Sequence, residues 1–170
     1  MGYENFIAES QKLNPSPVIE LFTLDFTQMP AYTSGTPTLY QVTPEKDSVT
    51  FDGDTYVSGG IEFRPAPVEL EGKIPEPELA AWGQDNILRQ ALNNFGTLLL
   101  LPIIRTKVRR IHLDDGANPD TEAKVESIFY LDELLVRTKD TLKWQLTPAP
   151  GLGKPSTSAL GTQTRRTFNA

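Results

Sequence analysis

Alternation of apolar and polar residues, the pattern of a β-strand, recurs along this sequence between residues 18 and 148. In the strongest segment, Val18–Thr27, Phe22 and Leu24 share one face and Ile19 and Leu21 share the other. We therefore expect both faces of this strand to be at least partly covered. Further strands are predicted at Thr38–Val42, Val49–Phe51, Thr55–Val57, Ile61–Arg64, Leu98–Leu113, Val125–Val136 and Thr141–Thr147.

Turn and breaker residues divide these strands. Asp52-Gly53-Asp54 predicts a tight hairpin, and Ser58-Gly59-Gly60 predicts a reversal or bend. The alternation slips at Arg109-Arg110, which indicates a bulge or strong bend in the long strand. Residues 65–78 contain four prolines and read as an edge segment, because proline cannot donate to a strand ladder.

Two short helices are expected beside the strands. Residues 3–13 form about two and a half helical turns, ended by the prolines at 15 and 17. Gln84–Asn94 carries apolar residues at helical spacing, with Gly96 placed to stop it. The fold is predicted to be mainly β: a small β-barrel over residues 1–149 with one or two short helices. Residues 150–170 are rich in Pro, Gly, Ser and Thr and are predicted to be an extended C-terminal arm.

Charge changes the picture of what this fold contacts. The net charge is −6, but residues 1–100 carry 14 acidic and 5 basic side chains, and residues 101–170 carry 8 acidic and 11 basic. An acidic chain is a poor nucleic-acid binder, because phosphate neutralisation supplies most of that affinity. The two unlike halves can instead attract each other between copies, or they are simply solvated surface. We predict that the basic cluster contacts another subunit: Arg105, Lys107, Arg109 and Arg110.

The candidate chemistry is sparse, and we expect no enzyme, no cofactor and no metal site. The sequence contains no cysteine, which excludes thiolate nucleophiles and cysteine-held clusters. The single histidine, His112, lacks a catalytic motif and is interpreted as a structural strand-end residue. Asp132 and Glu133 are neighbours on a strand and are predicted to point to opposite faces. The longest apolar run, residues 98–104, is too short to span a bilayer, and the N-terminus does not resemble a secretory signal.

Several segments together resemble the minor tail protein L family, which builds the tail tip of long, non-contractile-tailed phages. They are NPSPVIELFTLDFT, FDGDTYVSGGIEF, PEPELAAWGQ, FGTLLLLPIIRTKVRRIHLDDG, IFYLDELLVRT and TLKWQLTPA, in that order. A hairpin motif of the family is matched by Phe51, Gly53 and Tyr56, and a late R-R-x-F element by Arg165, Arg166 and Phe168. The resemblance covers roughly residues 3–168.

The resemblance implies a β-barrel hub protein of the virion tail tip, made in the host cytoplasm. It implies a closed ring, a trimer, that joins the distal tail end to the central hub or receptor-binding assembly. The implied partners are the distal tail protein, the central hub or fibre protein and the tape measure protein. Arg165, Arg166 and Phe168 are then candidate inter-subunit contacts. Many members have a cysteine-rich C-terminal domain able to hold an iron–sulfur cluster, from which this cysteine-free sequence departs.

A second hypothesis remains open, that of a free-standing β-barrel binding module that recognises carbohydrate. Sugar sites present exposed aromatic residues with polar neighbours, and Trp82 is the one plausible stacking residue outside the expected core. Size in solution separates the two hypotheses, because a tail-tip adaptor oligomerises or copurifies with particles.

Overall fold

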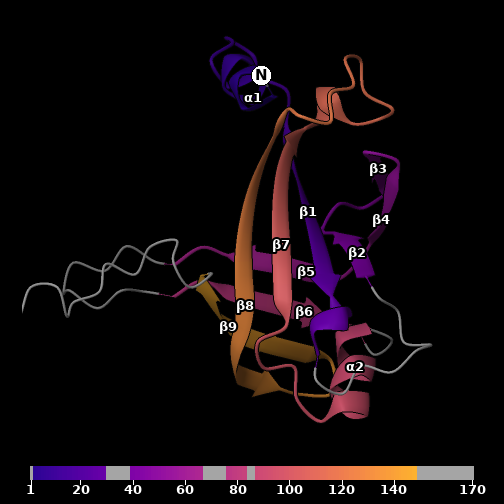
Figure 1. The fold of residues 1–170 in the computed structure, drawn as a ribbon, viewed down its shortest axis with the longest axis vertical. Helices are drawn as coiled ribbons and strands as arrows, with labels where there is room; N and C mark the ends of the chain where they lie inside the picture. Colours follow the sequence, from indigo (N-terminus) through magenta and orange to yellow (C-terminus); the bar gives the residue numbers. More distant parts are fainter. Residues whose placement is uncertain (1, 30–38, 67–75, 84–86, 149–170) are drawn as a thin grey trace, which may run out of the picture.

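The fold is a single nine-stranded sheet with two short α-helices, seen in a computed structural model (Figure 1). The structure describes residues 2–29, 39–66, 76–83 and 87–148. The strand order is β3-β4-β2-β1-β7-β8-β9-β6-β5. The elements are α1 (Gly2–Ser10), β1 (Val18–Asp25), a 3-10 turn η1 (Phe26–Gln28), β2 (Leu39–Thr43), β3 (Val49–Phe51), β4 (Asp54–Ser58), β5 (Ile61–Arg64), β6 (Glu78–Trp82), α2 (Ile87–Phe95), β7 (Pro102–Arg109), a second 3-10 turn η2 (Arg110–His112), β8 (Lys124–Arg137) and β9 (Thr141–Pro148).

Three long strands, β1, β7 and β8, form the spine of the sheet and stand side by side in Figure 1. All of their ladders are antiparallel. Strand β7 ends at Arg109 because the residues that follow it bond to the segment before β1 and do not continue the ladder. The backbone N–H of Arg110 donates to the Pro17 carbonyl at 2.9 Å, and that of Ile111 donates to Ser16 Oγ at 3.1 Å. The predicted slip at Arg109-Arg110 is thus a sharp turn, η2, and the long strand is shorter than predicted.

Strand β1 is buried on both faces, as its sequence predicts. Phe22 and Leu24 belong to a large lower core, whereas Ile19 and Leu21 belong to a smaller upper core. The upper core is closed by the β3–β4 hairpin, which contributes Val49, Phe51 and Tyr56, while Val108 of β7 and Leu113 complete it. One strand therefore holds two apolar clusters on opposite faces of the sheet.

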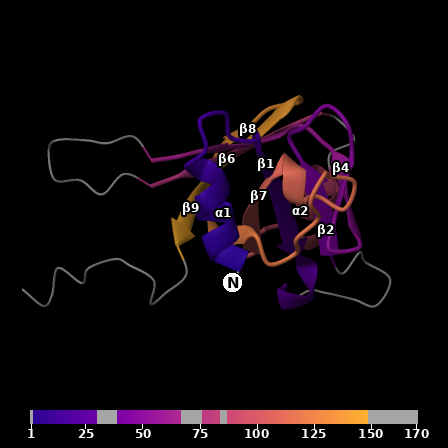
Figure 2. The same ribbon diagram turned by 90° about the horizontal axis from the view of Figure 1, so that it is seen from above.

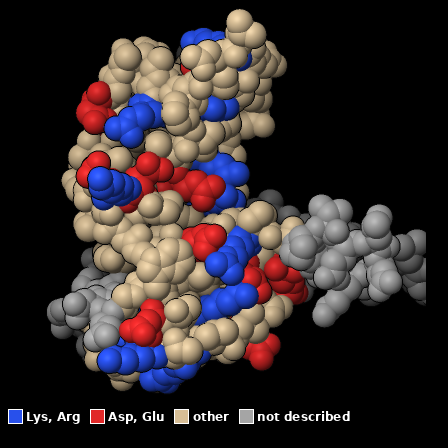
Figure 3. Space-filling view, turned by 180° about the vertical axis from the view of Figure 1, so that it is seen from behind, with Lys and Arg blue, Asp and Glu red and all other residues tan. Residues whose placement is uncertain are grey.

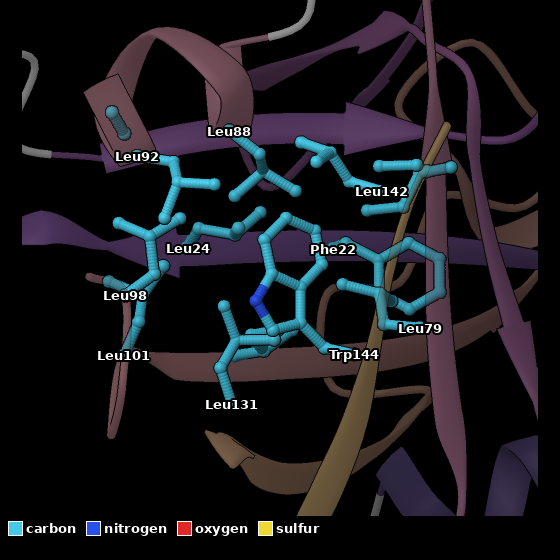
Figure 4. Packing of buried hydrophobic residues seen from close by; sticks show 14 of the residues in the cluster. Phe22, Leu24, Leu79, Leu88, Leu92, Leu98, Leu101, Leu131, Leu142 and Trp144 are labelled. Carbon is cyan, nitrogen blue, oxygen red and sulfur yellow. The ribbon is translucent and has the colours of Figure 1, made fainter. Parts of the chain in front are cut away.

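Trp144 lies at the centre of the lower core (Figure 4). It is 2% exposed and is surrounded by leucine side chains from several strands, from α2 and from the loop after α2. Helix α2 contributes Leu88 and Leu92, and its end is formed by Gly96, whose backbone N–H donates to the Leu92 carbonyl at 2.9 Å with φ of 75°. The predicted core positions of Leu142, Trp144 and Leu146 are all confirmed.

The chain passes from one part of the sheet to its far end through two glycines. Strand β4 pairs with β2, and strand β5 pairs with β6. Only Gly59 and Gly60 separate β4 from β5 in the sequence. The Gly59 N–H donates to the Thr43 carbonyl at 3.0 Å, while the Gly60 carbonyl accepts from the Trp82 N–H at 2.8 Å. The sheet is therefore curled so that β2 and β6 both pair with one bent stretch of chain, which runs from β4 through Gly59 and Gly60 into β5.

The predicted mainly β fold is confirmed, and most predicted strands lie within a few residues of their expected bounds. The barrel is not shown, because the strand order ends at β3 and β5, and no ladder among the described residues joins those two strands. The proline-rich segment 65–78 lies largely outside the described residues, and the predicted arm, 150–170, lies entirely outside them. Helix α1 ends earlier than predicted, at Ser10.

We expect Gly60→Ala to destabilise the fold by about 1–3 kcal/mol, the usual cost of inserting a methyl group where there is no space. An added Cβ would lie 2.6 Å from the backbone oxygen of Trp82, which is fixed by the pairing of Trp82 with Thr141 of β9. Urea unfolding followed by circular dichroism measures the loss. The control is Val57→Ala, an exposed position in the same stretch of chain, which should change the free energy of unfolding by less than about 1 kcal/mol. Equal losses for the two variants would contradict the proposed role of Gly60.

Candidate interaction surface

Three of the four residues of the predicted basic cluster share one face of β7. Arg105, Lys107 and Arg109, here called the basic row, alternate along the strand and so point the same way. Their register partners on β1 are Phe22, Glu20 and Val18. The fourth residue, Arg110, lies outside the strand in η2 and is exposed.

Arg105 is held by partners within the chain. Its guanidinium forms an ion pair with Glu20 and lies 3.8 Å from the ring centroid of Phe63. The side chain is only 13% exposed, so the charge depends strongly on this carboxylate and on the aromatic face. Arg105 is therefore used mainly to join β7, β1 and β5.

Arg109 joins the N-terminal segment to the sheet. Its Nη1 donates to the Ser16 carbonyl at 2.5 Å, and its Nη2 donates to Ser10 Oγ at 2.6 Å. Its guanidinium lies 5.2 Å from the Phe6 ring centroid. Helix α1, which is too short to be stable alone, is thereby docked over the end of β7 (Figure 2).

Lys107 and Arg110 remain available for contacts outside the chain. In the described ranges, neither side chain makes an ion pair or a hydrogen bond. Of the other predicted contacts, Arg165, Arg166 and Phe168 lie outside the described residues. The structure therefore brings the basic row together on one face but uses two of its three members internally.

An acidic surface lies on the other side of the same strands. The β3–β4 hairpin exposes Asp47, Asp52 and Asp54 and packs against the face of β1 and β7 that carries Ile19, Leu21 and Val108. We call residues 47–58 the acidic hairpin. Its turn is held by a residue that the sequence did not single out for this role: the Asp114 carboxylate accepts from the backbone N–H groups of Asp52 and Gly53, each at 3.0 Å.

Seen from behind, basic and acidic side chains are interleaved rather than segregated (Figure 3). A nucleic-acid surface gathers many cations along one track, because each phosphate contact needs one. The mixed pattern on this face does not form such a track.

His112 and Asp132 each have a structural partner. His112 is buried, and its Nδ1 lies 2.9 Å from the Asn118 carbonyl oxygen. Asp132 accepts from Thr147 Oγ1 at 3.1 Å. A register shift between Leu131 and Leu134 interrupts the regular alternation there, and both Asp132 and Glu133 are exposed.

Two carboxylates steady the N-terminal helix and the loop beneath it. A hydrogen bond from Lys12, together with one from the Ser16 backbone, lowers the pKa of Glu9 although its burial acts in the opposite direction. The Asn5 side chain donates to Asp120 at 2.7 Å and is the main cause that lowers the pKa of Asp120. Both interactions favour the ionised carboxylate, so their contribution is present above about pH 4 and is lost as the pH falls through the lowered pKa values.

Trp82 is 44% exposed at the end of β6. Its indole lies against the backbone of Gly60, where an added Cβ would come within 2.6 Å of the ring. One side of this ring is therefore occupied by the chain itself, which reduces its suitability as a platform for a sugar.

An apolar groove lies on the outer face of β7 and β8. Its volume is about 360 Å³. Leu100 is 65% exposed beside it and has a φ of 65°, a conformation that leucine rarely adopts. The backbone of this turn is fixed by β8, because the Leu100 N–H donates to the Leu131 carbonyl at 2.8 Å. The groove is lined by Asp25, Gln28, Leu100, Pro102, Ile104, Ile128 and Tyr130.

In the described part of the chain, the helices are all too short, or too polar, to cross a bilayer. Across residues 2–29, 39–66, 76–83 and 87–148, no group of three or more histidine, aspartate or glutamate side chains is arranged to hold a metal ion. No protein-family model matches the sequence, and no curated protein matches it.

We expect Glu20→Ala to lower the free energy of unfolding by about 1–3 kcal/mol, because it leaves the poorly exposed guanidinium of Arg105 without its carboxylate. Glu62→Ala is the matched control. It removes the partner of Arg64, an ion pair 2.9 Å long whose two side chains are both well exposed, and should cost less than about 1 kcal/mol. Chemical denaturation of both variants gives the comparison. A Glu20 variant as stable as the Glu62 variant would show that Arg105 does not need Glu20.

Proposed function

We propose that this protein is a structural component of a phage tail tip. It forms a ring that joins the distal tail end to the central hub or receptor-binding assembly, and it acts through assembly rather than catalysis. The ring is a trimer and lies at the virion tail tip, as the family resemblance implies. Its neighbours there are the distal tail protein, the central hub or fibre protein and the tape measure protein.

The observation that carries this proposal is the position of two charged features on opposite faces of β1 and β7. The basic row lies on one face, and the acidic hairpin packs on the other. A contact between two different faces of identical subunits is heterologous, and it generates a closed ring when the rotation between neighbours closes. Lys107 and Arg110 are the cations best placed for such a contact, since Arg105 and Arg109 have partners within the chain.

The order of the elements also supports the proposal. The segments on which the resemblance rests become β1, the β3–β4 hairpin with β5, β6, β7 with η2, β8 and β9, and each contributes to one continuous sheet. The carbohydrate-binding alternative depends on Trp82, whose indole is partly covered by Gly60. We therefore favour the assembly function.

Mass spectrometry of purified virions tests this function directly. We expect the chain among the virion proteins at a low copy number, as suits a tail-tip ring. Detection only in the soluble lysate of infected cells, with none in particles, would overturn the proposal.

Charge reversal tests the surface on which the proposed function rests. Lys107→Glu with Arg110→Glu should reduce assembly of tail tips while the isolated protein keeps its fold, because neither side chain has an internal partner among the described residues. The control is Lys139→Glu in the exposed turn between β8 and β9. Electron microscopy of particles measures the assembly of tail tips, and circular dichroism of the purified variants measures whether the isolated protein is folded. Normal tails with the double variant would exclude this surface as the subunit contact.

A further inference from the structure

Strand β8 has a free edge along its first half. Its 14 residues pair with β7 over Lys124–Tyr130 and with β9 over Phe129–Arg137. Residues 124–128 therefore have a strand partner on one side only, in the described part of the chain. Figure 1 shows this half of β8 with no strand on its outer side. An unpaired edge offers backbone N–H and carbonyl groups to another strand.

The apolar groove meets this free edge at Ile128. The lining residues from β1, η1 and β7 lie on the other side of β8, and Tyr130 of β8 extends the groove toward β9. Ile128 is well exposed for an isoleucine, and so is Leu100 on the other side of the groove. A strand added to the edge would thus find backbone partners and an apolar site for a side chain at the same place, which is how β-strand addition gains affinity and specificity.

The chain itself supplies a suitable strand. Strand β9 ends at Pro148, opposite Phe129, so 22 residues of sequence follow from the foot of the free edge. The residues immediately after β9, Ala-Pro-Gly-Leu-Gly, are poor strand formers and do not favour direct continuation of β9 along the edge. Residues 162–168, Thr-Gln-Thr-Arg-Arg-Thr-Phe, are better strand formers, and they place Arg166 and Phe168 on one face.

We infer that residues 162–168 of a second copy of this chain add as a strand to the free edge of β8. Phe168 packs against Ile128 at the rim of the apolar groove, and Arg166, on the same face, lies near Glu126, an exposed residue that also forms an ion pair with Lys124 at 3.0 Å. This inference rests on the proposed ring and gives it a second connection, in which each copy reaches its neighbour with its C-terminal segment.

Cross-linking of purified full-length protein tests the connection, and the absence of native cysteine makes each introduced thiol unique. A Ser127→Cys chain carrying an affinity tag is mixed with an untagged Thr167→Cys chain and treated with a short bis-maleimide, because both residues point away from the groove face in the proposed pairing. We expect a tagged–untagged product. With Val57→Cys as acceptor, an exposed position on β4, we expect that product to fall to background.

A double Ser127→Cys/Thr167→Cys chain separates the two sources of the added strand. Cross-links between chains support the inference. Cross-links confined to one chain at low protein concentration overturn it, because the segment would then dock on its own copy, and so does the absence of any product above background.

Proline substitutions test whether the contact is a strand. Successive residues of a strand donate in opposite directions, so Thr164→Pro with Arg165→Pro removes one donor facing β8 in any register. We expect this variant to lose the tagged–untagged product, while Ser156→Pro with Thr157→Pro, outside the proposed strand, retains it. Equal cross-linking of both would overturn strand addition. Because these measurements use purified protein, they fail independently of the search in virions.

Discussion

The whole sheet depends on the close approach of the chain to itself at Gly59 and Gly60. Strand β4 pairs with β2, and strand β5, which follows it directly, pairs with β6. At the two glycines between β4 and β5 there is no room for a side chain. A Cβ at Gly59 would lie 2.4 Å from a methyl group of Val42, and one at Gly60 would meet the Trp82 backbone. Two adjacent glycines therefore set how tightly the sheet curls, and the curl in turn encloses the lower core around Trp144.

The two cores give the two ends of the molecule different roles. The lower core is large, includes α2 and is built from most of the strands. The upper core is smaller and rests on the hairpin turn, which Asp114 holds in place. The charged surfaces are found around this upper part, where β7 carries its basic side chains and the hairpin carries its acidic ones. A rigid lower body thus positions a smaller upper part that is suited to contacts.

Local sequence patterns predicted the strands well because each depends on its own alternation. Val18–Thr27 indicated burial on both faces, and Trp144 indicated a core position, and both are confirmed. The candidate surface was harder to predict, since it depends on which residues distant in sequence become neighbours. Arg105 looked free in the sequence, yet Glu20 and Phe63 reach it from other strands. Asp114 gave no local sign of its partners 61 and 62 residues earlier. For Arg109 the sequence did contain a signal, because the break in alternation at Arg109-Arg110 marked the end of the strand.

The position of β1 in the middle of the sheet has a consequence for biosynthesis. Its main partner, β7, lies about 85 residues later in the chain, as the Glu20–Arg105 pair illustrates. The first hundred residues leave the ribosome before β1 has a strand on its β7 side, so its apolar residues remain without their final cover until residue 109 has emerged. Folding of such a chain is completed late, and non-local pairing of this kind slows it. Until β7 arrives, the uncovered apolar side chains of β1 are a surface on which nascent chains can associate with one another.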